Sequence, residues 1–231
     1  MRIYPLILLA AFFSVAVLSA QSSPEPMSVS FSCISWSGNI FDLSYQKGQD
    51  VMPIRVTSDF RSEQYSYMGP NPIVFFREVM GPEGILIKQP IASASIPNGM
   101  THALLIFNKL ESPDSAGREY RILVIDDGST NFPWGSFRVF NFSEHQIGGI
   151  IADEKFVIQP KSFQTISPKY DDDKNMGVRF SINFEGEWIP AMSTRWRYHD
   201  TGRNLVFLTT ETTNIKPHLE AKIISQYLNG R

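Results

Sequence analysis

The sequence predicts an all-β protein made of two antiparallel, immunoglobulin-like β-sandwich domains. Apolar and polar residues alternate over many short segments, which is the pattern of strands with one buried face. Clusters of Gly, Pro, Asn and Asp separate these segments, as they do in the turns of a sandwich. A third observation is that the segment 30–37 recurs at 136–143, which suggests a tandem duplication of one domain.

The two repeated segments match apolar residue for apolar residue without a gap. The matched apolar pairs are Phe31 with Phe137, Cys33 with Val139, Ile34 with Phe140, and Trp36 with Phe142. The match is clearest over 30–45 against 136–151 and becomes looser beyond. The shared positions are strand positions and not acids, histidines or nucleophiles, so the repeat predicts a common scaffold. We therefore expect function where the copies differ, at 60–72, around Trp134 and at 171–175.

The N-terminus has the features of a secretory signal peptide at 1–20. Arg2 gives a short positive start, and an apolar run over 3–18 precedes the polar segment 21–26. A retained membrane anchor is the alternative. The apolar run is shorter than the roughly 20 residues that a membrane span needs. We therefore expect an exported chain with no transmembrane segment after cleavage.

The first domain is predicted at 27–127. Val29, Phe31 and Cys33 alternate with serines, which indicates a half-buried first strand. Further strands are predicted at 40–46, 51–57, 63–68, 73–79, 84–88, 91–96, 103–108 and 119–125. Most of them are separated by turn residues of the kind found at 69–72 and 81–84.

The second domain is predicted at 136–231, after a linker at 128–135. Its strands are predicted at 136–143, 147–151, 155–159, 162–167, 176–184, 187–198, 203–210 and 218–225. The C-terminal segment also has a loose helical period through Leu219, Ile223 and Leu228. Comparison with the end of the first domain favours a closing strand over a helix.

Composition and charge disfavour several classes of partner. The formal net charge is −2, and no run of Lys or Arg exceeds two residues, so neither nucleic acid nor an anionic membrane is expected. The single cysteine, Cys33, excludes an intramolecular disulfide. Alternation around Cys33 indicates a buried side chain, and a reactive thiol is the alternative. Aromatic residues make up 13% of the chain and can supply a core without disulfides.

The residues that usually carry catalysis are dispersed. There is no Gly-x-Ser-x-Gly motif, and the four histidines lie far apart in the sequence, at His102, His145, His199 and His218. Glu185 and Glu187 flank a glycine in a predicted hairpin turn, where both are expected to face solvent. We predict no catalytic residue, no cofactor and no enzyme. A hydrolase built from dispersed residues is the remaining alternative.

Two acidic loops, at 126–131 and 171–175, have the composition of calcium loops. Neither has the spacing of a helix–loop–helix calcium site, and Lys174 would oppose a cation. Solvated turns, in which Asp and Asn stabilise backbone bends, are the favoured interpretation. The single cysteine and the scattered histidines also disfavour zinc. No metal ligand is assigned, and calcium binding by these loops stays open.

Exposed aromatic rings could bind a carbohydrate. Tyr65 and Tyr67 alternate with polar residues and so share one face of a strand, and Trp134 lies in the linker between Pro133 and Gly135. We take Tyr65, Tyr67 and Trp134 as the candidate ligand contacts.

A second aromatic set follows the long strand at 187–198. Trp188, Trp196 and Tyr198 share parity along it, which is typical of residues that point into a core. The same alternation places Arg195 and Arg197 on the opposite face of the strand.

Three segments carry a resemblance to known proteins. Residues 135–143 followed by 155–160 resemble a strand–Asn–hydrophobic–Ser phrase and Pro-ended hairpin of secreted bacterial β-sandwich proteins of unknown function. The accessory proteins of alginate acetylation, which are tandem sandwiches, have a similar phrase, and 120–127 is similar to a phrase in small envelope proteins. The resemblance implies an exported tandem sandwich and assigns no catalytic residue.

Together these observations predict an exported protein of a bacterial cell envelope, located in the periplasm, at the cell surface or in the medium. The expected role is a non-catalytic binding or scaffold module that works through sheet faces, edges and loops. Its partner would be an envelope protein or a polysaccharide. Carbohydrate binding is the alternative, and a hydrolase is the third hypothesis. The oligomeric state is left open.

Overall fold

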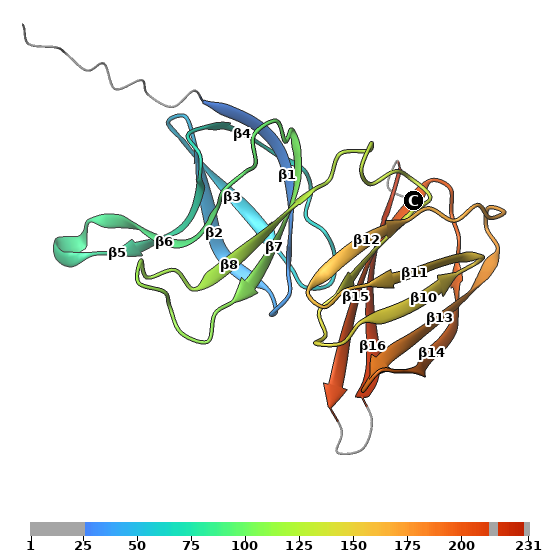
Figure 1. The fold of residues 1–231 in the computed structure, drawn as a ribbon. Coiled ribbons are helices and arrows are strands. Elements are labelled where there is room, and N and C mark those ends of the chain that lie inside the picture. The colour runs from blue at the N-terminus through green and yellow to red at the C-terminus, as the bar shows by residue number, and fades with distance from the viewer. Residues whose placement is uncertain (1–25, 213–216, 229–231) are drawn as a thin grey trace, which may run out of the picture.

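The computed structural model describes residues 26–212 and 217–228. The expected signal peptide at 1–20 lies outside the described residues. Within this part of the chain, no helix has the length and apolar character that a membrane crossing requires. Strands account for most of the described residues, and they form two β-sandwiches that lie side by side (Figure 1). The predicted fold class is confirmed.

Strands β1 to β8 form the first sandwich. They are β1 (Met27–Ser35), β2 (Ile40–Lys47), β3 (Asp50–Val56), β4 (Tyr65–Gly69), β5 (Ile73–Met80), β6 (Leu86–Ala94), β7 (His102–Lys109) and β8 (Tyr120–Asp126). The order β4-β1-β7-β8 makes the sheet that faces the other half, which we call the first inner sheet. The order β3-β2-β5-β6 makes the first outer sheet. A short 3-10 turn, η1 (Pro82–Gly84), joins β5 to β6.

Strands β9 to β16 form the second sandwich. They are β9 (Phe137–Asn141), β10 (Ile147–Ile151), β11 (Glu154–Ile158), β12 (Ser162–Ile166), β13 (Asn175–Phe184), β14 (Glu187–Arg197), β15 (Gly202–Thr212) and β16 (Pro217–Tyr227). The second inner sheet has the order β12-β9-β15-β16, and the second outer sheet has the order β11-β10-β13-β14. The C-terminal segment is therefore a strand, as comparison with the first domain predicted, and it pairs with β15 along its whole length.

The two sandwiches share one topology. Every strand of the first half has a counterpart with the same neighbours in the second half, from β1 and β9 to β8 and β16. Both halves also contain the same exception to antiparallel pairing, because β1 runs parallel to β7 and β9 runs parallel to β15. This shared exception supports the duplication that the repeated segment suggested.

Each sandwich encloses its own core. In the first, Phe31, Tyr45, Phe75 and Phe107 pack mainly edge-to-face, with ring centroids 5.2 to 6.3 Å apart where they touch. In the second, Phe180 and its neighbours on β13 alternate between buried inward positions and exposed or half-buried outward positions. The strand period of two thus explains both cores.

The two inner sheets also pack against each other, so that each carries buried apolar residues on both faces. Ile34 and Ile106 of the first inner sheet join Phe140 and Phe207 of the second in one apolar cluster. Trp36 meets Phe142 edge-to-face, with the ring centroids 5.0 Å apart. The repeated segment therefore supplies both sides of its strand: one set of apolar residues fills each core, and the other set fills the contact between the sandwiches. The molecule consequently has four stacked sheets.

One predicted pair of strands is a single strand. The segments 84–88 and 91–96 form one strand, β6, which pairs with β5 throughout. The register shifts by one residue, since Phe76 lies opposite Pro90 and Phe75 lies opposite Ala92. Pro90 cannot donate a ladder hydrogen bond, and the bulge lets the strand continue past it.

Candidate functional site

Tyr65 and Tyr67 do share one face of their strand, as predicted, but that face points into the first core. Tyr67 is buried, and its hydroxyl donates a hydrogen bond of 2.7 Å to the Pro70 carbonyl oxygen. Tyr65 is half-buried, with its ring centroid 5.6 Å from that of Phe31. Burial raises the pKa of both tyrosines. The two rings pack within the sandwich and do not form a surface for stacking.

Trp134 lies half-buried at the junction of the two sandwiches. The guanidinium of Arg203 sits over its ring, 4.8 Å from the centroid. In the same segment Phe132 is fully buried, with Arg203 and Arg138 both over its ring. Phe132 and Trp134 therefore anchor the segment 128–135 at the junction, whereas 129–131 is exposed.

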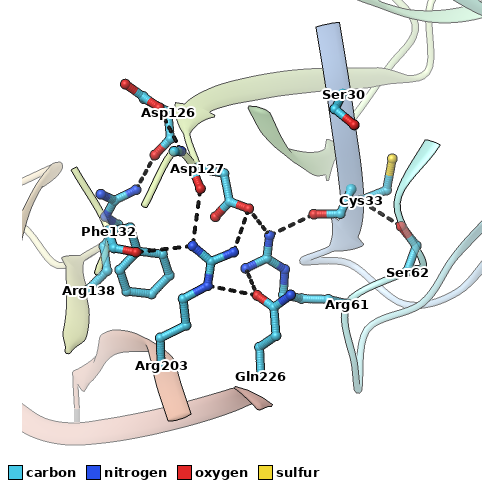
Figure 2. Close-up of polar contacts among 12 residues, drawn as sticks. Ser30, Cys33, Arg61, Ser62, Asp126, Asp127, Phe132, Arg138, Arg203 and Gln226 are labelled. Carbon is cyan, nitrogen blue, oxygen red and sulfur yellow. Dashed lines mark hydrogen bonds and ion pairs between the residues drawn. The ribbon is translucent and has the colours of Figure 1, made fainter. Parts of the chain in front are cut away.

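A buried cluster of charged side chains holds this junction together (Figure 2). The Asp127 carboxylate accepts hydrogen bonds from Arg61 and from Arg203, the latter at 2.9 Å from Nη2 to Oδ2. All three side chains are less than a tenth exposed. The Gln226 Oε1 atom accepts from both arginines, at 2.7 Å from Arg61 Nη1 and 2.9 Å from Arg203 Nε. Because these residues come from both halves, the cluster fixes one half against the other.

Burial lowers the pKa of two arginines of this region. Burial lowers the pKa of Arg203, and the Asp127 carboxylate partly offsets that effect. Burial likewise lowers the pKa of Arg138 to about 10. Arg138 donates to the backbone carbonyls of Asp126 and Asn131, so its charge is also satisfied by the junction. The cluster is a structural set of ion pairs in which Asp127 Oδ2 receives both arginines, whereas Asp127 Oδ1 and Arg61 Nε are buried without a hydrogen-bond partner among the described residues.

Both acidic loops are stabilised by contacts within the protein. The Asp126 carboxylate accepts hydrogen bonds from the Gly128 N–H and from the Asn131 amide. In the second loop Asp171 pairs with Lys174 at 2.9 Å and Asp173 pairs with Arg197 at 2.6 Å. Among the described residues, no group of three or more His, Cys, Asp or Glu side chains is placed to hold a metal ion.

The groups considered for catalysis are separate from one another. Cys33 is fully buried in the first core, and burial raises the pKa of its thiol. The histidines lie on different elements: His102 contacts Thr101, His145 packs on Phe184, His199 packs on Tyr227, and His218 is exposed. No hydrogen bond among the described residues joins a serine side chain to a histidine ring.

The second outer sheet has one face open to solvent. Its outward side chains form rows that cross the four strands, because opposite residues in paired strands point to the same face. The first row holds the amides and the tryptophan: Gln159, Gln146, Asn183 and Trp188. The second row is mostly small or apolar: Val157, Gly148, Ser181 and Pro190. The third row contains two cations, in the order Lys155, Ile150, Arg179 and Ser193, and a fourth row contains Gly177 and Arg195. We call this surface the second outer face.

Trp188 belongs to this face and not to the core, which corrects the prediction from parity. The register between β13 and β14 shifts by one residue: Phe180 lies opposite Met192, and Ser181 lies opposite Pro190. The extra residue reverses the alternation along β14. Trp196 therefore packs into the second core against Phe137, while Trp188 points outward and is 47% exposed.

A shallow groove of about 730 Å³ runs across the second outer face. Its floor is low at Gly148 and Gly149, and Trp188 borders it. A Cβ atom on Gly148 would lie 3.0 Å from the Trp188 ring, so the ring leans over this glycine. Val157, on the opposite border, is 50% exposed. The groove thus combines an aromatic border with a floor that carries no side chain at Gly148.

The charges on this face are all of one sign. Lys155, Arg179, Arg195 and Arg197 point outward, and no carboxylate occupies a described outward position of the four strands. Arg197 is paired with Asp173. The other three form no ion pair or hydrogen bond with the described residues. The acidic residues of these strands are Glu154 and Glu187. Both lie at hairpin ends, at positions that alternate toward the other face of the sheet.

The equivalent surface of the first sandwich also carries a groove, of about 390 Å³, but its aromatic ring and its cation contact each other. Phe76 is buried there, with the Lys88 ammonium 4.9 Å above its ring. The same ammonium donates a hydrogen bond of 2.5 Å to Gln46. In the first sandwich the ring and the cation thus contact each other. In the second sandwich Trp188 and Lys155 are both exposed to solvent.

No protein-family model matches the chain, and no curated protein matches it. The site is therefore defined by its geometry. Sequence reasoning placed Trp188 in the core and did not connect Lys155 with Arg179, because the pairing of β10 with β11 and β13 was not available from the sequence. Pro190, a residue that central strands avoid, was the signal that could have indicated the bulge.

Proposed function

We propose that the protein is a non-catalytic binding module of a bacterial cell envelope, and that it binds saccharide chains on the second outer face. The observation that carries this proposal is the exposed Trp188 ring beside a groove on a sheet face that is open to solvent. An aromatic ring offers a flat apolar surface for the C–H face of a sugar. The amides of Gln146, Gln159 and Asn183, in the same row, can donate to and accept from sugar hydroxyls.

The location in the envelope rests on the sequence. The predicted signal peptide at 1–20 supports export. An exported domain can fold without disulfides when its hydrophobic core is large enough, and the aromatic residues of this chain can supply such a core. The periplasm, the cell surface and the medium all agree with such a signal. A saccharide ligand agrees with each of these places.

The non-catalytic role is supported by the separation of reactive groups. The Cys33 thiol is buried, and the histidines lie on different elements. The Thr101 hydroxyl lies 3.1 Å from His102 Nδ1, but no carboxylate of the described residues pairs with that ring, so it lacks the third group of a catalytic triad. The groove itself is lined by apolar, cationic and hydroxyl side chains. Such a lining favours binding over acid–base chemistry, which would need a titratable pair.

A glycan array with the mature chain tests this proposal. We expect binding to a saccharide that falls at least ten-fold in Trp188→Ala. Phe41→Ala is the matched control, because it removes an even more exposed ring, 70% exposed, from the first sandwich, and it should bind like the wild type. Absence of saccharide binding, or a loss that follows Trp134→Ala and spares Trp188→Ala, would overturn the proposal.

A further inference from the structure

We infer that the saccharide recognised by the second outer face is an anionic polysaccharide. This inference rests on the proposed function and names the chemistry of its ligand. The carrying observation is a set of outward cations on the same face as Trp188, beginning two rows away from it. Lys155 and Arg179 lie in one row, and Arg195 lies in the next, all facing the same side of the sheet.

The cations lack counter-charges within the protein. Lys155, Arg179 and Arg195 make no ion pair with any described residue, whereas Arg197, on the same face, is neutralised by Asp173. The whole chain has a formal net charge of −2, so a face with only cations is a local separation of charge. Repulsion among these groups is relieved when an anion binds, and this gives the face complementarity to negative charge.

The geometry suits an extended chain with repeated charges. Adjacent strands are about 4.8 Å apart, so Lys155 and Arg179, two strands apart, are separated by about 10 Å at the backbone. A rise of about 3.4 Å per residue puts the Trp188 row and the Arg195 row about 20 Å apart along β13. A polymer lying along β13 would thus stack on Trp188 at one end and meet cations toward the other.

The cations on this face are of two kinds. A guanidinium presents a planar fork that pairs with carboxylate or sulfate through two parallel hydrogen bonds, and the Lys155 ammonium adds a point charge. Carboxylated and sulfated polysaccharides share this recognition chemistry. The amide row beside Trp188 can serve the uncharged hydroxyls of either polymer.

Calorimetric titration of the mature chain with two matched polymer pairs tests the inference. The first pair is polygalacturonate and its methyl ester, which share a backbone and differ in charge. The second pair is dextran sulfate and dextran. We expect the acidic member of at least one pair to bind at least ten-fold more tightly than its neutral partner, and the preferred pair identifies the anionic group. The preference should shrink as NaCl is raised, because salt screens exposed charges.

Variants distinguish the contribution of the cations to binding from that of the Trp188 ring. Lys155→Gln with Arg179→Gln should remove most of the preference for the acidic polymer, while the binding of the neutral partner is kept. Lys109→Gln, an exposed cation of the first sandwich, is the matched control and should retain the preference. Since all three side chains are exposed, the circular dichroism spectra and melting temperatures of these variants should match those of the wild type.

The outcomes distinguish this inference from the proposed function. Equal affinity for the acidic and neutral members, with both lost in Trp188→Ala, would keep the saccharide-binding function and overturn the anionic ligand. Lack of binding to all four polymers, together with a blank glycan array, would overturn both. Tighter binding of a single-stranded oligonucleotide than of either acidic polymer would identify a nucleic acid and also overturn the inference.

Discussion

Asp127 is the residue on which the junction between the two sandwiches depends most. Its carboxylate is the counter-charge for two buried arginines, Arg61 and Arg203, which come from different halves of the chain. A buried ion pair adds little net stability when it is complete, but the loss of one partner leaves an uncompensated buried charge. At this site one carboxylate balances two cations, so its loss is more serious than that of either arginine.

We expect Asp127→Asn to lower the free energy of unfolding by about 3–5 kcal/mol, because both guanidinium groups lose their counter-charge. Urea denaturation followed by circular dichroism measures this change. The control is Asp171→Asn, which removes a carboxylate from an exposed pair with Lys174 and should leave the midpoint unchanged. Similar effects of the two substitutions would contradict the role given to Asp127.

The role of Asp127 was not predictable from the sequence. The loop 126–131 had the composition of a solvated turn or a calcium loop, and the contacts of Asp126 match the turn. The partners of Asp127 lie 66 and 76 positions away, so no local spacing points to them. A residue whose function depends on distant cations becomes visible only after the sandwiches are stacked.

Strand β10 is the element that shapes the candidate site. It has two adjacent glycines, which lie on opposite faces of the second outer sheet, and on each face the absence of a side chain leaves room for an aromatic ring. Gly148 faces outward under Trp188, and Gly149 lies beneath the Phe156 ring, inside the second core. A side chain at either position would have to displace an aromatic ring.

We expect Gly149→Ala to destabilise the protein by about 1–3 kcal/mol, because its Cβ would overlap the buried Phe156 ring and force the core to shift. Thermal and urea unfolding would reveal the loss. Gly177→Ala, also within the second outer sheet, has no atom within 4 Å of the new Cβ and should be as stable as the wild type or slightly more so. An equally mild effect at both positions would show that the core around Phe156 is loosely packed.

Alternation predicted the strands well, and it failed where a bulge interrupts it. The ranges expected for β2, β5, β10 and β13 differ from the observed bounds by one residue at most, because these strands have regular half-buried patterns. Along β14 the bulge near Pro190 reversed the parity, so Trp188 was assigned to the wrong face. Strand existence depends on local pattern, but the face that a side chain occupies depends on register with a neighbour.

The whole molecule is a stack of four sheets whose middle two carry buried apolar residues on both faces. Two sandwiches were predictable from the restart of the pattern at residue 136. Their contact was indicated only indirectly, by apolar residues at both parities of the repeated segment, such as Ile34 beside Cys33. The stacking of Phe140 on Phe207, with ring centroids 4.9 Å apart, is part of a core shared by both halves.

We expect the two sandwiches to unfold together in a single transition, since the shared apolar cluster and the Asp127 ion pairs couple them. Phe207→Ala removes a buried ring from that contact and should separate the unfolding into two steps. Calorimetry and fluorescence-detected urea unfolding measure the number of transitions. Two transitions in the wild type would mean that the halves are not coupled.

The place of binding is best tested by two-dimensional ¹H–¹⁵N NMR spectra of the mature chain during titration with the acidic polysaccharide that binds it. Binding on the second outer face should shift the backbone amides of Gly148, Ile150 and Arg179 and the indole N–H of Trp188, because these groups line or border the groove. Signals from the first outer sheet should stay in place. Shifts confined to the first sandwich, or to the junction around Trp134, would contradict a binding site on the second outer face.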